Sequence, residues 1–434
     1  MTRTGDRSPI GEPGPLGELG QPPASRPPEA LYVHVPFCVS LCPYCDFVVV
    51  AGAATRGPRN QVAAFLAALR RELELRADAL DARWGRVPGG ARTARPPLAS
   101  LYFGGGTPSL LPADEIAGIV ELVRARYGLS ADAEVTLEAN PGPDERGDAR
   151  PLAAAGVTRI SFGAQALDDA TLRVLGRRHR ARDVSAAVSD AREAGIRSLN
   201  LDLLYDVPGG TLAAWMDTLD AALALEPDHL SLYALTLDDP DAEGLTGPTG
   251  DHLPVARGAR RWRQTAVRGQ DEDRAAAMYH YAVHRLAEAG FEGYEISNWA
   301  RPGHESRHNL AYWERRPYEA VGPGAHAFDG ATRRWNAARL EPYVAALTPI
   351  DGGPGRLPQG GEEVVGAEAA AVEAVILGLR TSRGIPVAAS RRPPLAEQFD
   401  WALTGGLLEV TVDERIVFTT IGRLLSNELF SRLV

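Results

Sequence analysis

The stretch Phe37-Cys38-Val39-Ser40-Leu41-Cys42-Pro43-Tyr44-Cys45-Asp46 contains all three cysteines of this 434-residue chain, in the spacing Cys-x3-Cys-x2-Cys. It follows a short apolar run, Leu31 to Val35, which predicts a strand that ends where the cysteine loop begins. Three thiolates on one loop can converge on a single inorganic centre. Because iron–sulfur clusters normally have four thiolate ligands, a trio leaves one coordination position for a different group.

Two other uses of these cysteines fit the sequence less well. A disulfide would leave one cysteine over, in a chain with no secretory signal. A structural zinc would need a fourth ligand such as His34, which belongs to the alternating strand pattern before the loop.

The Cys-x3-Cys-x2-Cys spacing, with Phe47 shortly after it, resembles the signature of radical S-adenosylmethionine (SAM) enzymes. The flanking Tyr32-x-His34-x-Pro36-Phe37 is similar to the coproporphyrinogen dehydrogenase-like group of that family. The resemblance implies that Cys38, Cys42 and Cys45 hold a 4Fe-4S cluster, whose fourth iron is chelated by the amino and carboxylate groups of SAM. It also implies an electron donor, since an electron from the cluster cleaves the sulfonium and releases a 5'-deoxyadenosyl radical.

Composition narrows the function classes. A net charge of -10 and a pI near 5.5 argue against nucleic acid or an anionic membrane as a main partner, because both attract basic surfaces. No apolar run approaches the roughly 18 residues of a transmembrane segment. Three cysteines without a disulfide framework favour a reducing, cytoplasmic location.

Short apolar runs alternate with longer segments of helical period. The predicted strands are Leu31 to Val35, Ser100 to Phe103, Glu134 to Glu138, Arg159 to Phe162, Ser198 to Leu203 and His229 to Tyr233. The predicted helices between them are Asn60 to Ala77, Ala113 to Arg126, Asp169 to Leu175, Asp183 to Ala194 and Leu212 to Leu225. Polar or glycine-rich residues follow each strand, as at the mouth of a barrel. The pattern predicts an α/β fold with a partial (β/α)6 TIM-like barrel, which the resemblance to radical SAM proteins also implies.

Composition shifts divide the chain further. The expected parts are a disordered Pro/Gly-rich tail (1–29), the barrel with a C-terminal extension (30–347), a linker (348–362) and a small C-terminal domain (363–434). The last part should be a winged-helix-like α+β domain, with a helix from Glu363 to Leu379, a hairpin around Gly406 to Thr419 and a final helix from Gly422 to Leu433. Residues 82–97 and 244–270 look inserted, and the second, with five arginines, is expected to be a mobile solvated loop. A helix should resume from Asp271 to Ala289.

Several residues near strand ends are candidates for cofactor contacts. Glycines at 104–106 allow a backbone to approach a ligand closely, although a plain tight turn would also need them. The resemblance implies that Gly105, Gly106 and Thr107 bind the methionine end of SAM. It implies further contacts with SAM, or with a second copy of it, for Tyr32, Tyr44, Glu138, Gln165, Arg177 and Asp202. Taken singly, these residues are ordinary solvated or capping positions.

The sequence His304-Glu305-Ser306-Arg307-His308 satisfies the zinc-protease pattern His-Glu-x-x-His, which works when one helix face carries both histidines. Pro302-Gly303 directly before it favours a turn instead, and the expected third ligand position is Glu314. The protease hypothesis is therefore weak.

The region 294–326 contains His-Asn-x-x-Tyr-Trp, formed by His308, Asn309, Tyr312 and Trp313. It resembles the haem chaperone (HemW-type) branch, in which this motif is associated with haem binding. An imidazole can be an axial haem ligand and aromatic rings can shield the macrocycle, but core packing would explain the same residues. The resemblance implies haem as cargo, with haem-accepting proteins as partners.

The alternative is an oxygen-independent coproporphyrinogen III dehydrogenase. That branch usually has a fourth cysteine two positions after the third, where this chain has Phe47. Its substrate-covering N-terminal segment also has no counterpart in a Pro/Gly tail. Both differences favour the chaperone branch.

Overall fold

The computed structural model describes residues 24–52, 55, 60–85, 95–237, 257–349, 355–391 and 395–434. Most of the expected tail, most of the first inserted segment, the first part of the second and the middle of the expected linker lie outside these ranges. Within them, no helix is long and apolar enough to cross a membrane.

All six predicted strands are present and form the centre of one sheet. They are β1 (Ala30–Val35), β4 (Leu98–Gly105), β5 (Leu129–Ala139), β6 (Arg159–Gln165), β7 (Ser198–Tyr205) and β8 (His229–Ala234). Each pairs in parallel with the next. The α/β prediction with parallel pairing is confirmed, and the carboxyl ends of the strands gather at one edge, as in a barrel mouth.

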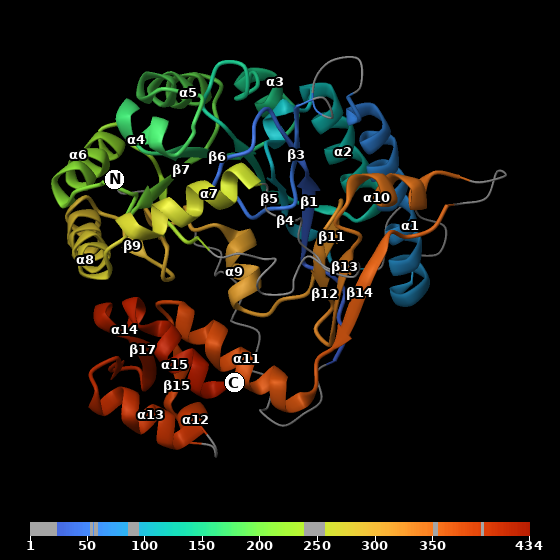
Figure 1. Ribbon diagram of the computed structural model, residues 1–434. Coiled ribbons are helices and arrows are strands. Elements are labelled where there is room, and N and C mark those ends of the chain that lie inside the picture. Colours follow the sequence, from blue (N-terminus) through green and yellow to red (C-terminus); the bar gives the residue numbers. More distant parts are fainter. Residues whose placement is uncertain are drawn as a thin grey trace, which may run out of the picture.

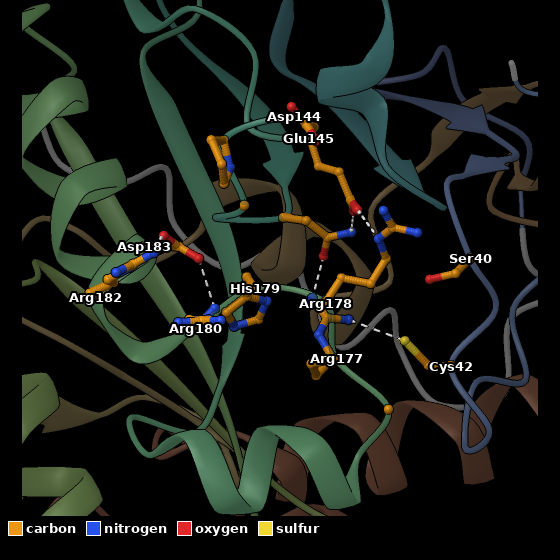
Figure 2. Close-up of a pocket in the computed structure, with 14 residues that line it drawn as sticks. Ser40, Cys42, Asp144, Glu145, Arg177, Arg178, His179, Arg180, Arg182 and Asp183 are labelled. Carbon is orange, nitrogen blue, oxygen red and sulfur yellow. Dashed lines mark hydrogen bonds and ion pairs between the residues drawn. The ribbon is translucent and has the colours of Figure 1, made fainter.

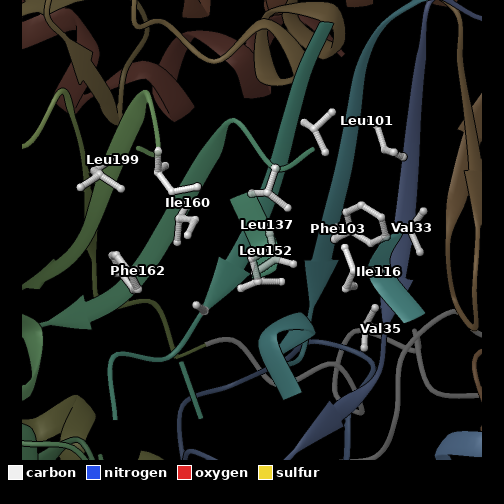
Figure 3. Close-up of a cluster of buried hydrophobic side chains, with 14 of the residues drawn as sticks. Val33, Val35, Leu101, Phe103, Ile116, Leu137, Leu152, Ile160, Phe162 and Leu199 are labelled. Carbon is white, nitrogen blue, oxygen red and sulfur yellow. The ribbon is translucent and has the colours of Figure 1, made fainter. Parts of the chain in front are cut away.

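Helices cover one face of this sheet (Figure 1). They are α1 (Val62–Trp84), α2 (Ala113–Arg126), α3 (Ala149–Ala154), α4 (Asp169–Val174), α5 (Ala181–Glu193) and α6 (Leu212–Leu223). Apolar strand residues meet them, and Figure 3 shows Phe103 beside Ile116 and Leu137 beside Leu152. The predicted helices are confirmed. Their ends differ from the prediction by a few residues, except that α1 is longer at its end. The prediction succeeds because the buried apolar residues recur at helical spacing in the helices and at strand spacing in the strands.

The opposite face of the sheet is polar. Tyr102 donates to Glu138 at 2.8 Å, and Ser161 donates to Asp202 at 3.1 Å, so these side chains meet across neighbouring strands. Successive residues of a strand point to opposite faces. The concave side of the barrel is therefore lined by hydrogen-bonding groups, while the convex side is packed against helices.

The sheet extends on both sides beyond the predicted strands. β11 (Tyr318–Val321) pairs in parallel with β1, and β12 (His326–Phe328), β13 (Thr332–Asn336) and β14 (Gln359–Val364) follow in antiparallel order. On the other edge, β10 (Asn298–Ala300) and β9 (Glu292–Gly293) continue from β8. A short pair, β2 (Phe37–Cys38) and β3 (Val50–Ala51), flanks the cysteine loop.

Several element predictions need correction. Residues 359–361, expected in a linker, and the expected helix start at Glu363 form β14 instead, because their backbone groups complete the ladder with β13. Residues 24–29, expected in the disordered tail, are bound to the sheet extension: Arg26 N donates to Asp329 O at 2.7 Å. The end of the second inserted segment is helical, as α7 (Arg257–Ala266) and η3 (Val267–Gly269), before the predicted α8 (Glu272–Glu288).

The C-terminal region has a hydrophobic cluster of its own, which includes Val375, Phe399 and Leu429. A three-stranded antiparallel sheet, β15 (Ile385–Pro386), β17 (Arg415–Phe418) and β16 (Leu408–Val410), confirms the predicted hairpin. The helices are α11 (Ala367–Arg380), α12 (Val387–Ser390), α13 (Leu395–Thr404), α14 (Thr420–Leu424) and α15 (Ser426–Leu433). The single final helix that was predicted is thus interrupted, because Leu425 leaves helical geometry (φ -101°, ψ 21°).

Figure 1 shows this region beside α9 (Arg307–Trp313), which lies between it and the barrel. Helix α10 (Leu340–Leu347) packs against α1 on the other side of the molecule.

Candidate functional site: the cysteine loop and the barrel mouth

The cysteine loop leaves the carboxyl end of β1, and Cys38, Cys42 and Cys45 are free, partly buried thiols. Burial is the main cause that raises the pKa of Cys38 to about 11 and that of Cys45 to about 12. Repulsion from Cys42 raises the pKa of Cys38 further, and repulsion from Cys42 and Cys38 raises that of Cys45. Such a trio suits one shared centre whose binding displaces the thiol protons.

The structure does not offer His34 as the fourth ligand of a zinc ion. His34, the possible fourth ligand, has both ring nitrogens in hydrogen bonds, to Tyr32 Oη at 3.1 Å and to Val48 O at 2.7 Å. Zinc would draw its ligands to within about 2.3 Å. The donor set therefore fits a larger thiolate-bound centre better.

Two side chains donate hydrogen bonds to the cysteine sulfurs. Thr107 Oγ1 donates to Cys38 Sγ at 3.6 Å, and Arg177 Nη1 donates to Cys42 Sγ at 3.3 Å. Asn140 links the two donors, since its Nδ2 donates to Thr107 Oγ1 at 3.1 Å and its Oδ1 accepts from Arg177 Nη2. Hydrogen bonds to sulfur are a main influence on the potential of an iron–sulfur cluster. Sequence reasoning did not assign Asn140 to the site, although its position directly after a strand was a usable signal.

A cavity of about 230 Å³ opens beside Cys42. Figure 2 shows Arg177 reaching the Cys42 sulfur from one wall, while Asp144 and Glu145 stand on another. The cavity is lined by Asn140, by the loop after β5 and by the stretch from Gly176 to Asp183. The arginine and the two carboxyl side chains on the walls could bind a ligand that carries both negative and positive groups.

Close packing against neighbouring residues requires glycine in the turn at 104–106. A Cβ on Gly105 (φ 111°) would lie 2.5 Å from the ring of His34, and one on Gly106 would lie 2.7 Å from Phe37 O. The N–H groups of Gly105, Gly106 and Thr107 donate to the Glu138 carboxylate, Val35 O and Phe37 O. Those N–H groups are therefore occupied by the protein, and a cofactor would have to meet other atoms of this turn.

The polar candidates at the other strand ends gather near the same mouth. A Cβ on Gly163 would lie 3.0 Å from Gln165 Nε2 and 3.4 Å from both Arg177 Nη2 and Asn140 Oδ1, so these side chains converge on one point. The ring of Tyr32 is stacked 6.1 Å from Tyr102.

Two carboxyls lie deeper on the polar face. Burial raises the pKa of Glu138 to about 7, and the nearby Asp202 adds to this effect. Burial also raises the pKa of Asp202, which accepts hydrogen bonds from Ser161 and from Asn200 Nδ2 at 2.7 Å. Buried carboxyls with raised pKa values favour a cationic ligand, which would stabilise their ionised form.

The residues of the His-Asn-x-x-Tyr-Trp motif lie at the opposite end of the barrel. Helix α9 sits on the amino-terminal halves of the strands, where Arg307 Nη1 donates to Asp132 Oδ2 at 3.1 Å and His308 Nδ1 is 2.9 Å from Ser100 Oγ. The cysteine loop follows the carboxyl end of the parallel strand β1. The structure therefore does not bring these residues together with the cluster cysteines.

His308 is enclosed by the protein. It is 1% exposed, its Nε2 is 2.8 Å from Tyr312 Oη, and its ring stacks 4.9 Å from Tyr102. Burial lowers the pKa of His308 to about 3. Both ring nitrogens already have hydrogen-bond partners, so His308 is not free to bind iron in this arrangement.

The rest of the motif also has protein partners. The ring of Tyr312 packs edge-on against Tyr318 at 4.6 Å, and the guanidinium of Arg380 lies 4.6 Å from the ring of Trp313. Asn309 N donates to the N-cap Ser306 at 3.3 Å. The motif thus packs α9 between the barrel and the C-terminal region.

The zinc-protease hypothesis is wrong. Helix α9 begins only at Arg307, so His304 and His308 do not share a helix face. His304 Nδ1 is 3.1 Å from Ser198 Oγ, whereas His308 points to Ser100, on a different strand.

Comparisons with known proteins identify the family of this chain. Residues 32–222 match the Radical SAM superfamily. The Mycobacterium tuberculosis protein "Heme chaperone HemW" is 37% identical over 423 residues, which cover 97% of this chain and 98% of that protein. The Bacillus subtilis protein of the same name is 29% identical over 93% of this chain and 98% of its own length. The Bos taurus protein "Radical S-adenosyl methionine domain-containing protein 1, mitochondrial" is 37% identical over 76% of this chain and 69% of that protein.

A solved structure shares the fold. The structure described as "Coproporphyrinogen III oxidase (HemN) from Escherichia coli is a Radical SAM enzyme" has a TM-score of 0.73, with 94% of this chain and 90% of that chain covered at 23% identity. This similarity supports the radical SAM barrel as the architecture of the chain.

Proposed function

Because this chain belongs to the family of proteins named Heme chaperone HemW, within the radical SAM superfamily, we propose that it binds haem and passes it to haem-accepting proteins. In this proposal Cys38, Cys42 and Cys45 hold a 4Fe-4S cluster that also binds SAM. An external electron donor would reduce the cluster. Unpaired cysteines of this kind suit the cytoplasm, where thiols stay reduced.

The observation that carries the cluster assignment is the pair of hydrogen bonds from Thr107 and Arg177 to cysteine sulfurs. When bound, the cluster would supply one electron at a time and an iron open to a chelating ligand. The protein's part is to hold three thiolates on one loop and to direct donors at them. Asn140 keeps both donors in place, so the surroundings of the sulfurs are fixed before any cofactor arrives.

The polar face below the loop supports a SAM site. SAM carries a positive sulfonium and a positive amino group, and Glu138 and Asp202 are buried carboxyls that gain from a nearby cation. The buried hydroxyl of Tyr44 interacts with Cys42 and Arg177, which places this side chain at the same site. We propose Tyr32, Tyr44, Gly105, Gly106, Thr107, Glu138, Gln165, Arg177 and Asp202 as the cofactor contacts.

We propose that haem binds at His308, Asn309, Tyr312 and Trp313. This binding requires a change in the hydrogen bonds of His308. His308 can ligate iron only after it releases Ser100 or Tyr312. Haem uptake through this residue should therefore loosen α9 from the base of the barrel. Since Trp313 packs against Arg380, the same movement would change the contact with the C-terminal region.

Titration of the anaerobically reconstituted protein with haem tests this proposal. We expect stoichiometric uptake by the wild type and a loss of affinity of about tenfold or more in His308→Ala, because an axial ligand is removed. His284→Ala, an exposed histidine on α8, is the matched control and should bind like the wild type.

The same preparation separates the chaperone from the dehydrogenase. Conversion of coproporphyrinogen III with release of 5'-deoxyadenosine would contradict the chaperone proposal and support the alternative enzyme. Equal haem affinity of the wild type and His308→Ala would show that haem binds elsewhere.

A further inference from the structure

Helix α7 carries a buried arginine in a segment whose composition predicts a solvated loop. Arg263 is 5% exposed, whereas its neighbour Arg261, on the same helix, is exposed. An arginine is seldom fully buried unless its guanidinium has fixed partners. The partners of Arg263 therefore indicate what α7 does.

Those partners are three successive carbonyl oxygens of the cysteine loop. Arg263 Nε donates to Pro43 O at 3.1 Å, and its Nη2 donates to Tyr44 O and to Cys45 O, both at 3.0 Å. The segment from Pro43 to Cys45 contains the third cysteine and directly follows the second. One side chain, more than 200 residues away in sequence, thus holds the turn that sets the spacing of Cys42 and Cys45.

The helix that carries Arg263 is itself fixed. Trp262 Nε1 donates to Val174 O at 3.1 Å, and its ring lies 6.3 Å from that of Tyr44. Beyond the helix, Arg274 Nε donates to Asp206 Oδ1 at 3.0 Å. Trp262 therefore fixes α7 directly before Arg263, and Arg274 fixes the following helix α8, so the guanidinium reaches the loop from a defined position.

Two physical effects follow from this contact. The planar guanidinium fork can hold several carbonyls at once, which a flexible ammonium cannot reproduce. Its permanent positive charge lies beside the cysteine loop, and a cluster gains negative charge when it is reduced. A fixed cation near the cluster therefore favours the reduced form, the more so because the site is partly shielded from water.

We propose that Arg263 is a positioning residue for the iron–sulfur cluster, which orders the Pro43 to Cys45 turn and raises the reduction potential of the cluster. This inference rests on the proposed cluster at Cys38, Cys42 and Cys45, but not on haem binding or on SAM cleavage.

Three variants separate the two effects. Arg263→Gln removes the charge and the fork, Arg263→Lys keeps the charge without the fork, and Arg261→Gln is the matched control on the same helix. In the reconstituted proteins we expect both Arg263 variants to lose iron to a chelator about tenfold faster than the wild type. The reduction potential, from a titration followed by electron paramagnetic resonance, should fall in Arg263→Gln and stay near the wild-type value in Arg263→Lys. Arg261→Gln should match the wild type in both measurements.

A second readout does not need the cluster. In the metal-free proteins, hydrogen exchange of the amides of residues 42–47 should be faster in Arg263→Gln than in the wild type and in Arg261→Gln. Unchanged exchange together with an unchanged potential would overturn the proposal. Equal potentials of the Lys and Gln variants would leave Arg263 a purely structural residue and contradict its electrostatic role. Absence of a cluster from the wild type would instead refute the proposed function. The hydrogen-exchange measurement would then still test whether Arg263 orders the cysteine loop.

Discussion

At the scale of single residues, the surroundings of Glu138 on the polar face of the barrel determine the pKa of its carboxyl group. It accepts hydrogen bonds from Tyr102 Oη at 2.8 Å and from Gly105 N at 2.9 Å, which favour the ionised carboxylate. Burial opposes them and prevails, so the pKa of Glu138 rises to about 7. The side chain is therefore poised to change charge near neutral pH.

Glu138→Gln is expected to change how stability depends on pH. A carboxyl whose pKa is about 7 in the folded protein and near 4.5 in the unfolded chain stabilises the fold most when both states are protonated. Its contribution is lost as pH rises from about 4.5 to 7. Wild type should therefore lose up to about 3 kcal/mol relative to Glu138→Gln over this range. Urea unfolding at several pH values measures the difference, and a constant difference across the range would contradict the raised pKa.

Glutamine can keep both contacts, since its oxygen can accept from Gly105 N and its amide can donate to the Tyr102 hydroxyl. If Glu138 also faces the sulfonium of SAM, the same variant should bind SAM more weakly at pH 8 than the wild type does.

Residue identities at the mouth were predictable to a large extent, because polar residues directly after buried strands share one edge of the sheet. Thr107, Gln165 and Arg177 do converge there with Asn140. His308 was less predictable. Its motif suggests a ligand, but only the tertiary structure shows that Ser100 and Tyr312 occupy both of its nitrogens.

At the scale of elements, a buried glutamate joins α1 to the sheet extension. Glu72 is fully buried and accepts from Arg76 Nε at 2.7 Å, from Asn336 Nδ2 at 2.8 Å, from Tyr343 Oη at 2.8 Å and from Gly322 N at 2.9 Å. These partners come from α1, β13, α10 and the turn after β11. The carboxylate therefore fixes the extension that holds β11 beside β1.

Glu72→Ala should destabilise the protein by about 3–5 kcal/mol, because it removes the nearer charged partner of the buried Arg76, which keeps only Glu319 at 4.0 Å. It also leaves Tyr343 Oη and Gly322 N without their acceptor. Glu121→Ala is the control. That exposed glutamate pairs with Arg124 on the surface of α2 and should cost no more than about 1 kcal/mol. Denaturant unfolding gives both values, and similar losses in the two variants would show that the Glu72 network contributes little.

The elements that sequence patterns missed have a common physical cause. β14 has no apolar face, since it begins Gln359-Gly-Gly and is mostly exposed at the edge of the sheet. β11 is four residues long and contains Glu319, which is buried through ion pairs with Arg334 and Arg76. Helix α7 buries an arginine instead of an apolar stripe. Periodicity detects burial of apolar side chains, so elements that are held by polar partners do not show in it.

At the scale of the whole molecule, the proposed cluster site and the proposed haem residues lie at opposite ends of the barrel. The cysteines, their hydrogen-bond donors and Arg263 are gathered at the carboxyl ends of the strands. Helix α9, with the proposed haem residues, closes the amino ends and contacts the C-terminal region through Trp313 and Arg380. A signal between cluster and cargo would have to cross the polar interior, where Tyr102 contacts both Glu138 and His308.

Spectroscopy of the anaerobically reconstituted protein tests whether Cys38, Cys42 and Cys45 hold a cluster that binds SAM. We expect about four irons and four sulfides per chain, a 4Fe-4S absorption spectrum, and a paramagnetic resonance signal of the reduced cluster that changes when SAM is added. Replacement of Cys42 by serine should abolish these features. A protein with intact thiols that forms no such cluster, or whose cluster signal does not change with SAM, would contradict the proposed cluster and SAM site.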